Sequence, residues 1–308
     1  MTNGTFESEE NNRMIREYVH EKILTEEYEK AGKEYKRNSK YGKKGDMKDP
    51  QKYQEYRGFY EKKYLPMRKA VEKLDFENHD DKAFQKCATV LNKYWKELEQ
   101  FRKRNSISDN SKLHTNFLEE FSCYFFSKLP SIDKFDIFVS DVFAGLKILP
   151  SHEIKQITKD VDFCIGNKLT VLAEEKKNIG GMDLRIPAVS VEVKSYVDAT
   201  MLGEIMNTAR KIKGANPGSK VILVTWINSF ADEHAIEAAF DSAIDEIVVI
   251  SDRKRSNKEN TVIEFTQEGL RDYYEVVRQA LEEVMNDEPV PAIGRLLAYV
   301  RHARSIKS

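Results

Sequence analysis

Residues 187–194 constrain the fold of this chain more than any other stretch. Three valines alternate there with polar residues in the order Val189-Ser190-Val191-Glu192-Val193-Lys194. An apolar residue at every second position is typical of a β-strand with one face in a core. The other face places a carboxylate and an ammonium side by side at the end of the strand. We therefore treat Glu192 and Lys194 as candidate site residues.

A Glu-x-Lys pair is weak evidence alone, because a third of this chain is charged and five similar pairs occur elsewhere. A partner lies upstream, where Asp160 and Asp162 precede the apolar run Phe163–Ile165. Gly166-Asn167 predicts a turn after this run, with a returning strand over 168–173. The alternative is that one of these aspartates, Glu192 and Lys194 form only a structural ion pair at the end of a strand.

The composition excludes several classes of protein. The chain has 308 residues and a net charge of −1, so only local charge can argue for nucleic acid. Its three cysteines (Cys87, Cys123 and Cys164) have unrelated spacings, which fits a reduced cytosolic protein and argues against zinc. The polar N-terminus is no signal peptide, and no apolar run is long enough to span a bilayer. We expect a cytoplasmic protein.

The N-terminal part is predicted to be helical, with helices over 13–31, 51–74 and 80–104. A polar break at 105–112 predicts a boundary between a region 1–110 and a catalytic domain 111–308. Residues 30–73 carry 15 Lys and Arg against 6 Asp and Glu. This block is either a solvated helix face or a DNA-phosphate surface; the candidates are Lys43, Lys44, Lys62 and Lys63.

The remaining chain predicts a mixed sheet flanked by helices, an α/β architecture. An apolar helix over 113–129 carries Glu119 and Glu120, and a strand at 135–139 is followed by a loop. Residues 174–185 also predict a loop. Asp198 can cap a helix over 200–213 that leads to a fully apolar strand at 221–227, as in a parallel crossover. A last strand (246–250), a basic segment with Arg253, Lys254 and Arg255, and a closing helix (267–285) follow.

Several of these segments, in this order, resemble type II restriction endonucleases of the BbvCI kind, which belong to the PD-(D/E)XK nuclease superfamily. The matching segments are Lys159–Gly166, Ile186–Val189, Val191–Lys194, Met201-Leu202 and Thr208-Ala209, with further matches at Leu118–Phe121 and Asp245–Ile247. The resemblance covers about residues 113–260. Val161 stands where the motif name has proline. Because the family's acidic ligand abuts the apolar strand, the resemblance favours Asp162 over Asp160.

The resemblance implies a PD-(D/E)XK core that hydrolyses duplex DNA with Mg²⁺. A hard cation that binds few protein carboxylates can relieve the charge on a phosphodiester. Asp162, Glu192 and the carbonyl of Val193 would bind it, and Lys194 would lie beside the attacking water. Burial would lower the pKa of Lys194, and the nearby carboxylates would raise it. Glu120, ahead of Glu119, would approach the metal through a water.

The family also implies partners. Its members read short interrupted sites related to CTNAG and work beside a cognate methyltransferase in a restriction-modification system. We expect a homodimer on a symmetric site, with a heterodimer as the alternative. Two other functions compete: a structure-specific repair nuclease of the same fold, and a DNA-binding subunit that needs a catalytic partner. The large N-terminal region disfavours the former, and the intact Asp162/Glu192/Lys194 set disfavours the latter.

Overall fold

The computed structural model describes Leu24 and residues 50–77, 81–105, 116–139, 141–148, 154–175, 178–228, 243–251 and 264–286. The chain forms two compact units. The first comprises Met1–Asp75 and Lys86–Phe125, and the second comprises Phe76–Gln85 and Phe126–Ser308. The helix expected over 13–31 lies outside the described residues, Leu24 excepted, as do nearly all of the break at 105–112 and the basic segment after 251.

The first unit is helical, as predicted. It contains α3 (Pro50–Phe59), a π-helical turn η1 (Tyr60–Tyr64), α4 (Leu65–Glu72), most of α5 (Asp81–Arg104) and α7 (Phe117–Phe125). Along α5 the buried side chains recur at intervals of three and four residues, so that one face of the helix is apolar. Aromatic rings fill the space between helices: Phe59 and Phe101 stack with centroids 4.3 Å apart, and Tyr94 lies 5.1 Å from Phe117.

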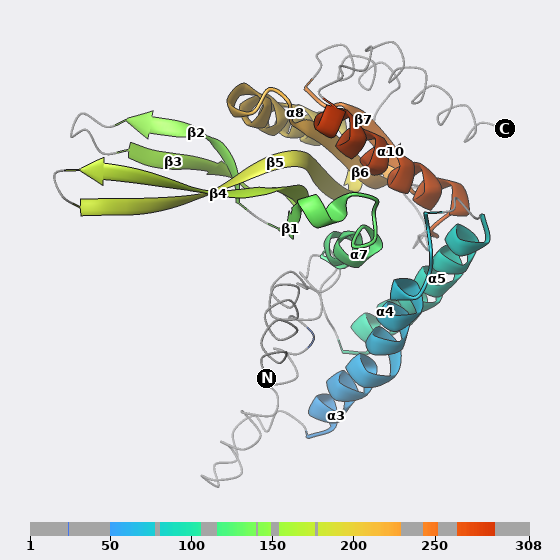
Figure 1. The fold of residues 1–308 in the computed structure, drawn as a ribbon. Helices are drawn as coiled ribbons and strands as arrows, with labels where there is room; N and C mark the ends of the chain where they lie inside the picture. The colour runs from blue at the N-terminus through green and yellow to red at the C-terminus, as the bar shows by residue number, and fades with distance from the viewer. Residues whose placement is uncertain are drawn as a thin grey trace, which may run out of the picture. The chain divides into compact units, whose positions relative to one another are not determined.

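The second unit is built on a five-stranded mixed sheet with the order β1-β4-β5-β6-β7 (Figure 1). The strands are β1 (Asp136–Phe138), β4 (Phe163–Glu175), β5 (Asn178–Val197), β6 (Lys220–Asn228) and β7 (Glu246–Val249). β1, β4 and β5 pair antiparallel, whereas β5, β6 and β7 pair parallel. The helix α8 (Ala199–Ala215) makes the crossover between β5 and β6, and α10 (Gln267–Asn286) packs against β5, β6 and β7. A single turn of 3-10 helix, η2 (Ile132–Lys134), precedes β1.

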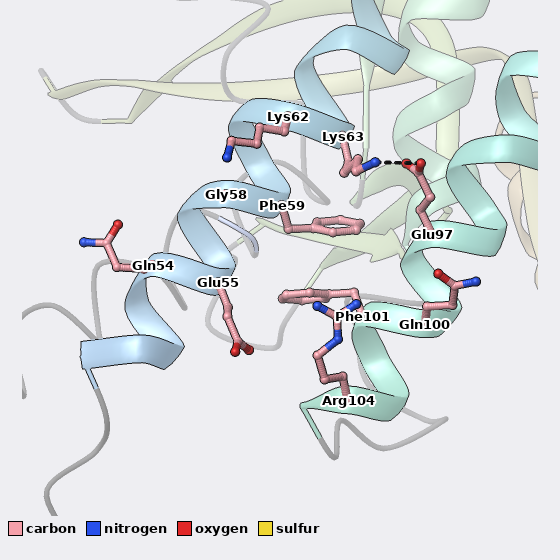
Figure 2. Close-up of a pocket in the computed structure, with 10 residues that line it drawn as sticks. All are labelled: Gln54, Glu55, Gly58, Phe59, Lys62, Lys63, Glu97, Gln100, Phe101 and Arg104. Carbon is pink, nitrogen blue, oxygen red and sulfur yellow. Dashed lines mark hydrogen bonds and ion pairs between the residues drawn. The ribbon is translucent and has the colours of Figure 1, made fainter.

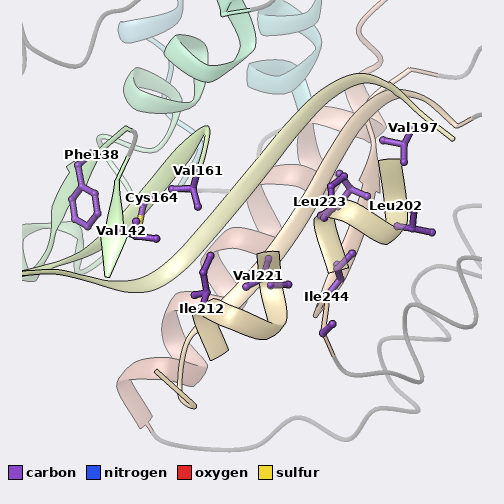
Figure 3. Close-up of a cluster of buried hydrophobic side chains, with 13 residues drawn as sticks. Phe138, Val142, Val161, Cys164, Val197, Leu202, Ile212, Val221, Leu223 and Ile244 are labelled. Carbon is purple, nitrogen blue, oxygen red and sulfur yellow. The ribbon is translucent and has the colours of Figure 1, made fainter. Parts of the chain in front are cut away.

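Strand β6 is apolar on both faces because both faces are covered. Val221 and Leu223 join a buried cluster with the inner face of α8 (Figure 3). Ile222 and Val224 point to the other face and are also fully buried. Asp198 caps the N-terminus of α8, because its carboxylate accepts a hydrogen bond from the Met201 backbone N–H at 2.9 Å. The mixed sheet flanked by helices is the fold that the sequence predicted.

The turn predicted at 166–167 and the loop predicted over 174–185 are wrong, because β4 and β5 continue far beyond the sheet as a two-stranded ribbon (Figure 1). The strands run through Gly166-Asn167, with only a bulge between Ile165 and Gly166. A Cβ on Gly166 would lie 2.2 Å from the Ile186 carbonyl oxygen, so glycine permits a close approach of strands there, not a turn. Gly180 and Gly181 belong to β5 and pair with Ala173 and Leu172, where the sequence predicted a loop.

A third prediction, a loop between the strand at 135–139 and Asp162, is also wrong. Strands β2 (Val142–Ile148) and β3 (Ile154–Lys159) form an antiparallel hairpin that contacts β5 and α8. Its base is anchored by Val142, which is fully buried, and by Asn216, whose amide donates to the Phe143 carbonyl at 2.9 Å. Mixed polar and apolar residues on both faces of the hairpin hide the alternation that marks a half-buried strand.

Candidate active site

The candidate site forms where β4 begins beside the inner half of β5. Asp162 immediately precedes β4, and Phe163 pairs with Val191 on β5, so Asp162 and the Glu192–Lys194 segment are brought to the same place. The valines at 189 and 191 are fully buried and that at 193 nearly so. Burial of these side chains holds the strand in register, and a shift by one residue would exchange its faces.

Three charged side chains meet here. The Lys194 ammonium donates to Asp162 Oδ2 at 2.8 Å and to Glu192 Oε2 at 3.1 Å. The backbone N–H of Val193 donates to the same Asp162 oxygen at 2.7 Å. Asp162 is therefore tied to β5 by a main-chain and a side-chain donor. The two carboxylates converge on one cation.

The electrostatics of the trio are those of a partly desolvated cluster with an excess of negative charge. Burial, and then the negative charge of Asp162, raise the pKa of Glu192 to about 7, against the opposing effect of Lys194. Burial lowers the pKa of Lys194, but Asp162 and Glu192 outweigh it and raise that pKa above its ordinary value. Lys194 is thus a protonated donor here, because the two carboxylates raise its pKa by more than burial lowers it.

A divalent cation fits this arrangement. Among the described residues no three His, Cys, Asp or Glu side chains gather into a complete metal cage. Mg²⁺ does not need one, because it binds one or two carboxylates and keeps water and phosphate oxygens as its other ligands. Because the pKa of Glu192 is raised to about 7, two neighbouring negative charges are unfavourable here without a compensating cation. A cation bound by Asp162 and Glu192 would stabilise both carboxylates in their ionised form. The carbonyl of Val193 stays a predicted ligand.

The sequence left two choices between neighbouring carboxylates, and in each pair the two side chains have different surroundings in the structure. Asp160 is exposed, while Asp162 contacts Lys194. On α7, Glu119 is half-buried, whereas Glu120 is fully buried and accepts a hydrogen bond from the Tyr64 hydroxyl at 2.6 Å. Glu120 belongs to the first compact unit and the trio to the second, and its support of the metal stays a prediction.

Asp245 belongs to one of the segments that resemble the family, and its contacts in the structure support the fold. Its carboxylate accepts the Val221 backbone N–H at 2.7 Å and pairs with Lys213 at the same distance. It therefore joins the start of β6 to the end of α8. Nothing in these contacts points to catalysis.

The proposed phosphate-contacting lysines are described in part. Lys62 and Lys63 lie exposed on the π-helical turn η1, at the rim of a pocket of about 340 Å³ between α3 and α5 (Figure 2). The stacked rings of Phe59 and Phe101 lie in the pocket, and Lys63 pairs with Glu97 at 2.8 Å. Lys43, Lys44, Arg253, Lys254 and Arg255 lie outside the described residues.

Comparison with known families agrees with this geometry. Residues 110–302 match the family model of the Bpu10I restriction endonuclease. The chain belongs to the Bpu10I restriction endonuclease family. It is accordingly a type II, site-specific deoxyribonuclease, and the resemblance drawn from its sequence motifs is confirmed.

Solved structures bear on the fold of this family member. One similar chain comes from the native BbvCI A2B2 tetramer at low resolution, with a TM-score of 0.61 and 17% identity over 82% of this chain and 95% of that one. The PspGI restriction endonuclease bound to substrate DNA aligns at 13% identity over 76% of this chain and 94% of that one, but its TM-score of 0.33 is too low to show a shared fold. A search of curated protein sequences found no match. In the described part of the chain, no helix is long and apolar enough to cross a membrane.

Proposed function

We propose that this endonuclease uses Mg²⁺, held by Asp162 and Glu192, to hydrolyse phosphodiester bonds in duplex DNA at a short interrupted site related to CTNAG. The observation that carries the proposal is the convergence of two carboxylates on the Lys194 ammonium, within 2.8 and 3.1 Å. The site sequence rests on the resemblance alone. A repair nuclease without base readout is disfavoured by the family match over residues 110–302.

Each residue of the site has its own role in this proposal. The metal supplies positive charge against the phosphate oxygens. Asp162 and Glu192 would bind it, and Val193 keeps Asp162 in place through its backbone N–H. Lys194 is held by both carboxylates, so its ammonium occupies a fixed position from which it can orient a water and stabilise charge that develops on the phosphate.

The experiment that tests this function is a digest of a plasmid of known sequence by the purified chain. Linear or nicked products should appear in Mg²⁺ and disappear when the metal is removed with EDTA. Sequencing the product ends should give one recurring motif with the CTNAG pattern. Cleavage that persists in EDTA would contradict the metal assignment, and ends without a common motif would contradict site-specific cleavage in this form.

The assembly is a separate proposal. One Asp162/Glu192/Lys194 site cuts one strand, so a double-strand break needs two sites, supplied most simply by a homodimer on a two-fold symmetric sequence. A second candidate, a heteromer with a related subunit, is favoured by the A2B2 composition of the BbvCI structure. A mixture of wild-type chain and Lys194→Ala separates the two. Hybrid homodimers should nick either strand equally, whereas a heteromer would confine nicking to one strand or require a second polypeptide.

A methyltransferase that modifies the same sequence is the functional partner we propose. It follows from the activity, because an endonuclease that cuts a short site would otherwise cut the DNA of its own cell. Its test is simple: DNA methylated at the mapped site should resist cleavage.

A further inference from the structure

The helix α5 has two sides of very different character along its 24 residues. Its apolar side chains, among them Phe84, Leu91 and Trp95, are buried in the protein. At 100° per residue, the exposed side chains from residue 85 onward all lie on the opposite side. They are Gln85, Lys86, Thr89, Lys93, Lys96, Gln100, Lys103 and Arg104, with no carboxylate among them. We call Lys86, Lys93, Lys96 and Lys103 the lysine face; all four belong to the first compact unit.

The protein does not neutralise the lysine face itself. In the described part of the chain, none of its four ammonium groups forms an ion pair. Two glutamates of α5 lie within one helical turn of lysines in the face, but both hold other cations. Glu97 pairs with Lys63 at 2.8 Å, and Glu99 pairs with Arg102 at 3.0 Å. The available carboxylates are therefore engaged away from the face.

Helix stability does not account for these lysines. Cations in the last turn of a helix are stabilised by its dipole, which explains Lys103 and Arg104. That effect does not extend to Lys86, Lys93 and Lys96 in the interior of α5. Like charges three residues apart, as at Lys93 and Lys96, destabilise a helix. Nor is the face a by-product of a basic chain, because the net charge is −1.

We propose that the lysine face of α5 lies along the phosphate backbone of duplex DNA and holds the duplex without reading its sequence. A lysine ammonium binds phosphate as a point charge and lacks the fork with which arginine recognises a base. Phosphate contacts position a protein on DNA but carry no sequence information directly. The face is about 25 Å long from Lys86 to Lys103. Because one turn of duplex is about 34 Å long, all four lysines can contact the same turn.

This assignment goes beyond the proposed metal and site sequence, and it requires only that the endonuclease binds DNA. Other partners fit the face less well. A helix that binds a membrane surface offers apolar side chains to the lipid, whereas Phe84, Leu91 and Trp95 are buried in the protein. A second copy of the same face would meet like charge. A phosphate backbone supplies the missing negative charge along the whole length of the face.

The test uses variants of the full chain in which glutamine replaces lysine. Lys86→Gln/Lys93→Gln and Lys96→Gln/Lys103→Gln each remove two charges, and a fourfold variant combines them. The matched control, Lys168→Gln/Arg271→Gln, also removes two exposed cations, but these pair with Asp183 and Asp81 inside the protein. Glutamine and lysine have similar helix propensities and the positions are exposed, so the variants should fold. Circular dichroism melts check this.

The first measurement is the salt dependence of binding. Two short fluorescent duplexes, one with the mapped site and one of unrelated sequence, are titrated in Ca²⁺ over a KCl series. Each double variant should flatten the slope of log K against log[KCl] by about two units, and the fourfold variant by about four. Both duplexes should be affected alike, because phosphates are the same in every sequence. The control should leave the slope unchanged.

The second measurement separates binding from chemistry. Because the lysine face is not expected to touch a reacting group, its loss should raise KM for plasmid DNA. The rate of cleavage at saturating DNA should stay within about twofold of the wild type, and sequenced product ends should show the wild-type motif. A fall in the saturated rate with KM unchanged would contradict the proposal.

Three outcomes of the binding experiment would also overturn it. The first is an unchanged slope in the fourfold variant. The second is a loss confined to one of the duplexes, which would indicate contacts with bases. The third is a changed molar mass in DNA-free sedimentation with the slope intact, which would make the face a contact with protein. Failure of the proposed function is distinguishable, because it appears in the wild type as absent or metal-independent cleavage, whereas failure of this inference leaves wild-type cleavage normal.

Discussion

The two ends of the β4–β5 pair differ in how they hold charge: at the inner end the charged side chains are largely buried and tightly grouped, whereas at the outer end an ion pair lies exposed on the surface. Lys194 lies between Asp162 and Glu192, and the exposed fractions of the three side chains are 29%, 22% and 10%. Lys168 and Asp183 at the outer end are 52% and 56% exposed. The same two-stranded geometry thus serves two tasks. The inner end holds one ammonium between two carboxylates away from water, and the outer end keeps the Lys168–Asp183 pair at the surface, where water screens it.

The difference has an energetic reason. A buried charge without a partner costs several kcal/mol, so the inner end must pair its ammonium with carboxylates to exist at all. An exposed lysine pair costs only a fraction of a kcal/mol, since water screens it. An exposed strand can therefore tolerate many arrangements of charge, while a reactive centre must be closely balanced.

The largest expected effect comes from the inner end. Lys194→Ala should reduce the rate of DNA cleavage by about 100-fold or more, because removal of one fixed charge donor at a reacting centre has effects of that order. Binding of duplex DNA in Ca²⁺ should survive, since Lys194 is not expected to contact bases. Rates of plasmid cleavage and fluorescence titrations measure the two quantities.

Lys168→Ala is the matched control for that variant. It removes an exposed lysine from β4 whose partner, Asp183, lies on the surface, so cleavage should change less than about twofold. Full activity in Lys194→Ala would remove the assignment of the trio. Equal losses in both variants would show that the inner and outer ends do not differ in the way described.

A second prediction separates the neighbouring aspartates. Asp162→Asn should lower cleavage by about 100-fold, because Asp162 is the carboxylate held beside Lys194 and Val193. Asp160→Asn should leave it within about twofold, because Asp160 is exposed. Both substitutions keep the side-chain shape, so thermal melts should differ little. An inactive Asp160 variant beside an active Asp162 variant would reverse the assignment.

The same contrast explains what the sequence can and cannot predict. The inner end was predictable because burial of one face in the core enforces valines at every second position, and charge stands on the other face only where a site uses it. The hairpin and the outer part of β5 were predicted as loops, and the outer part of β4 as a separate returning strand, because exposed strands tolerate any alternation and because glycines such as Gly166 and Gly180 normally indicate turns. The choice of Asp162 needed the family, since spacing alone left Asp160 open.

A third prediction concerns pH. The folded, metal-free protein holds the pKa of Glu192 at about 7, above its ordinary 4.5, first through burial and then through Asp162. The stability that this group contributes is therefore complete below pH 4.5 and lost as pH rises through about 7. A bound cation has the opposite preference, because it requires the ionised carboxylate.

Affinity for the cation should follow from this competition. Binding of Ca²⁺, used because it is not expected to support cleavage, should be about tenfold weaker at pH 6 than at pH 8, and should change little above pH 8. Isothermal titration calorimetry in two buffers of different ionisation enthalpy should also detect a released proton. Glu192→Gln should abolish the proton release. A pH-independent affinity in the wild type would show that Glu192 is not a ligand.

The smallest expected effect lies in the first unit, where one helical turn carries both a lysine in an ion pair and an exposed lysine. Lys63 pairs with Glu97 at 2.8 Å, whereas Lys62 beside it is exposed at the rim of the same pocket. If this surface contacts phosphates, Lys62→Gln should weaken binding of every duplex a few-fold and flatten the salt dependence by about one unit, regardless of sequence. Lys63→Gln should do less, because Glu97 already neutralises that charge.

Joining Lys43→Gln and Lys44→Gln to Lys62→Gln should add about one unit of slope for each further contact that is lost. An unchanged slope in all of them would return residues 30–73 to a solvated helix face, and DNA contact would then rest on other parts of the chain.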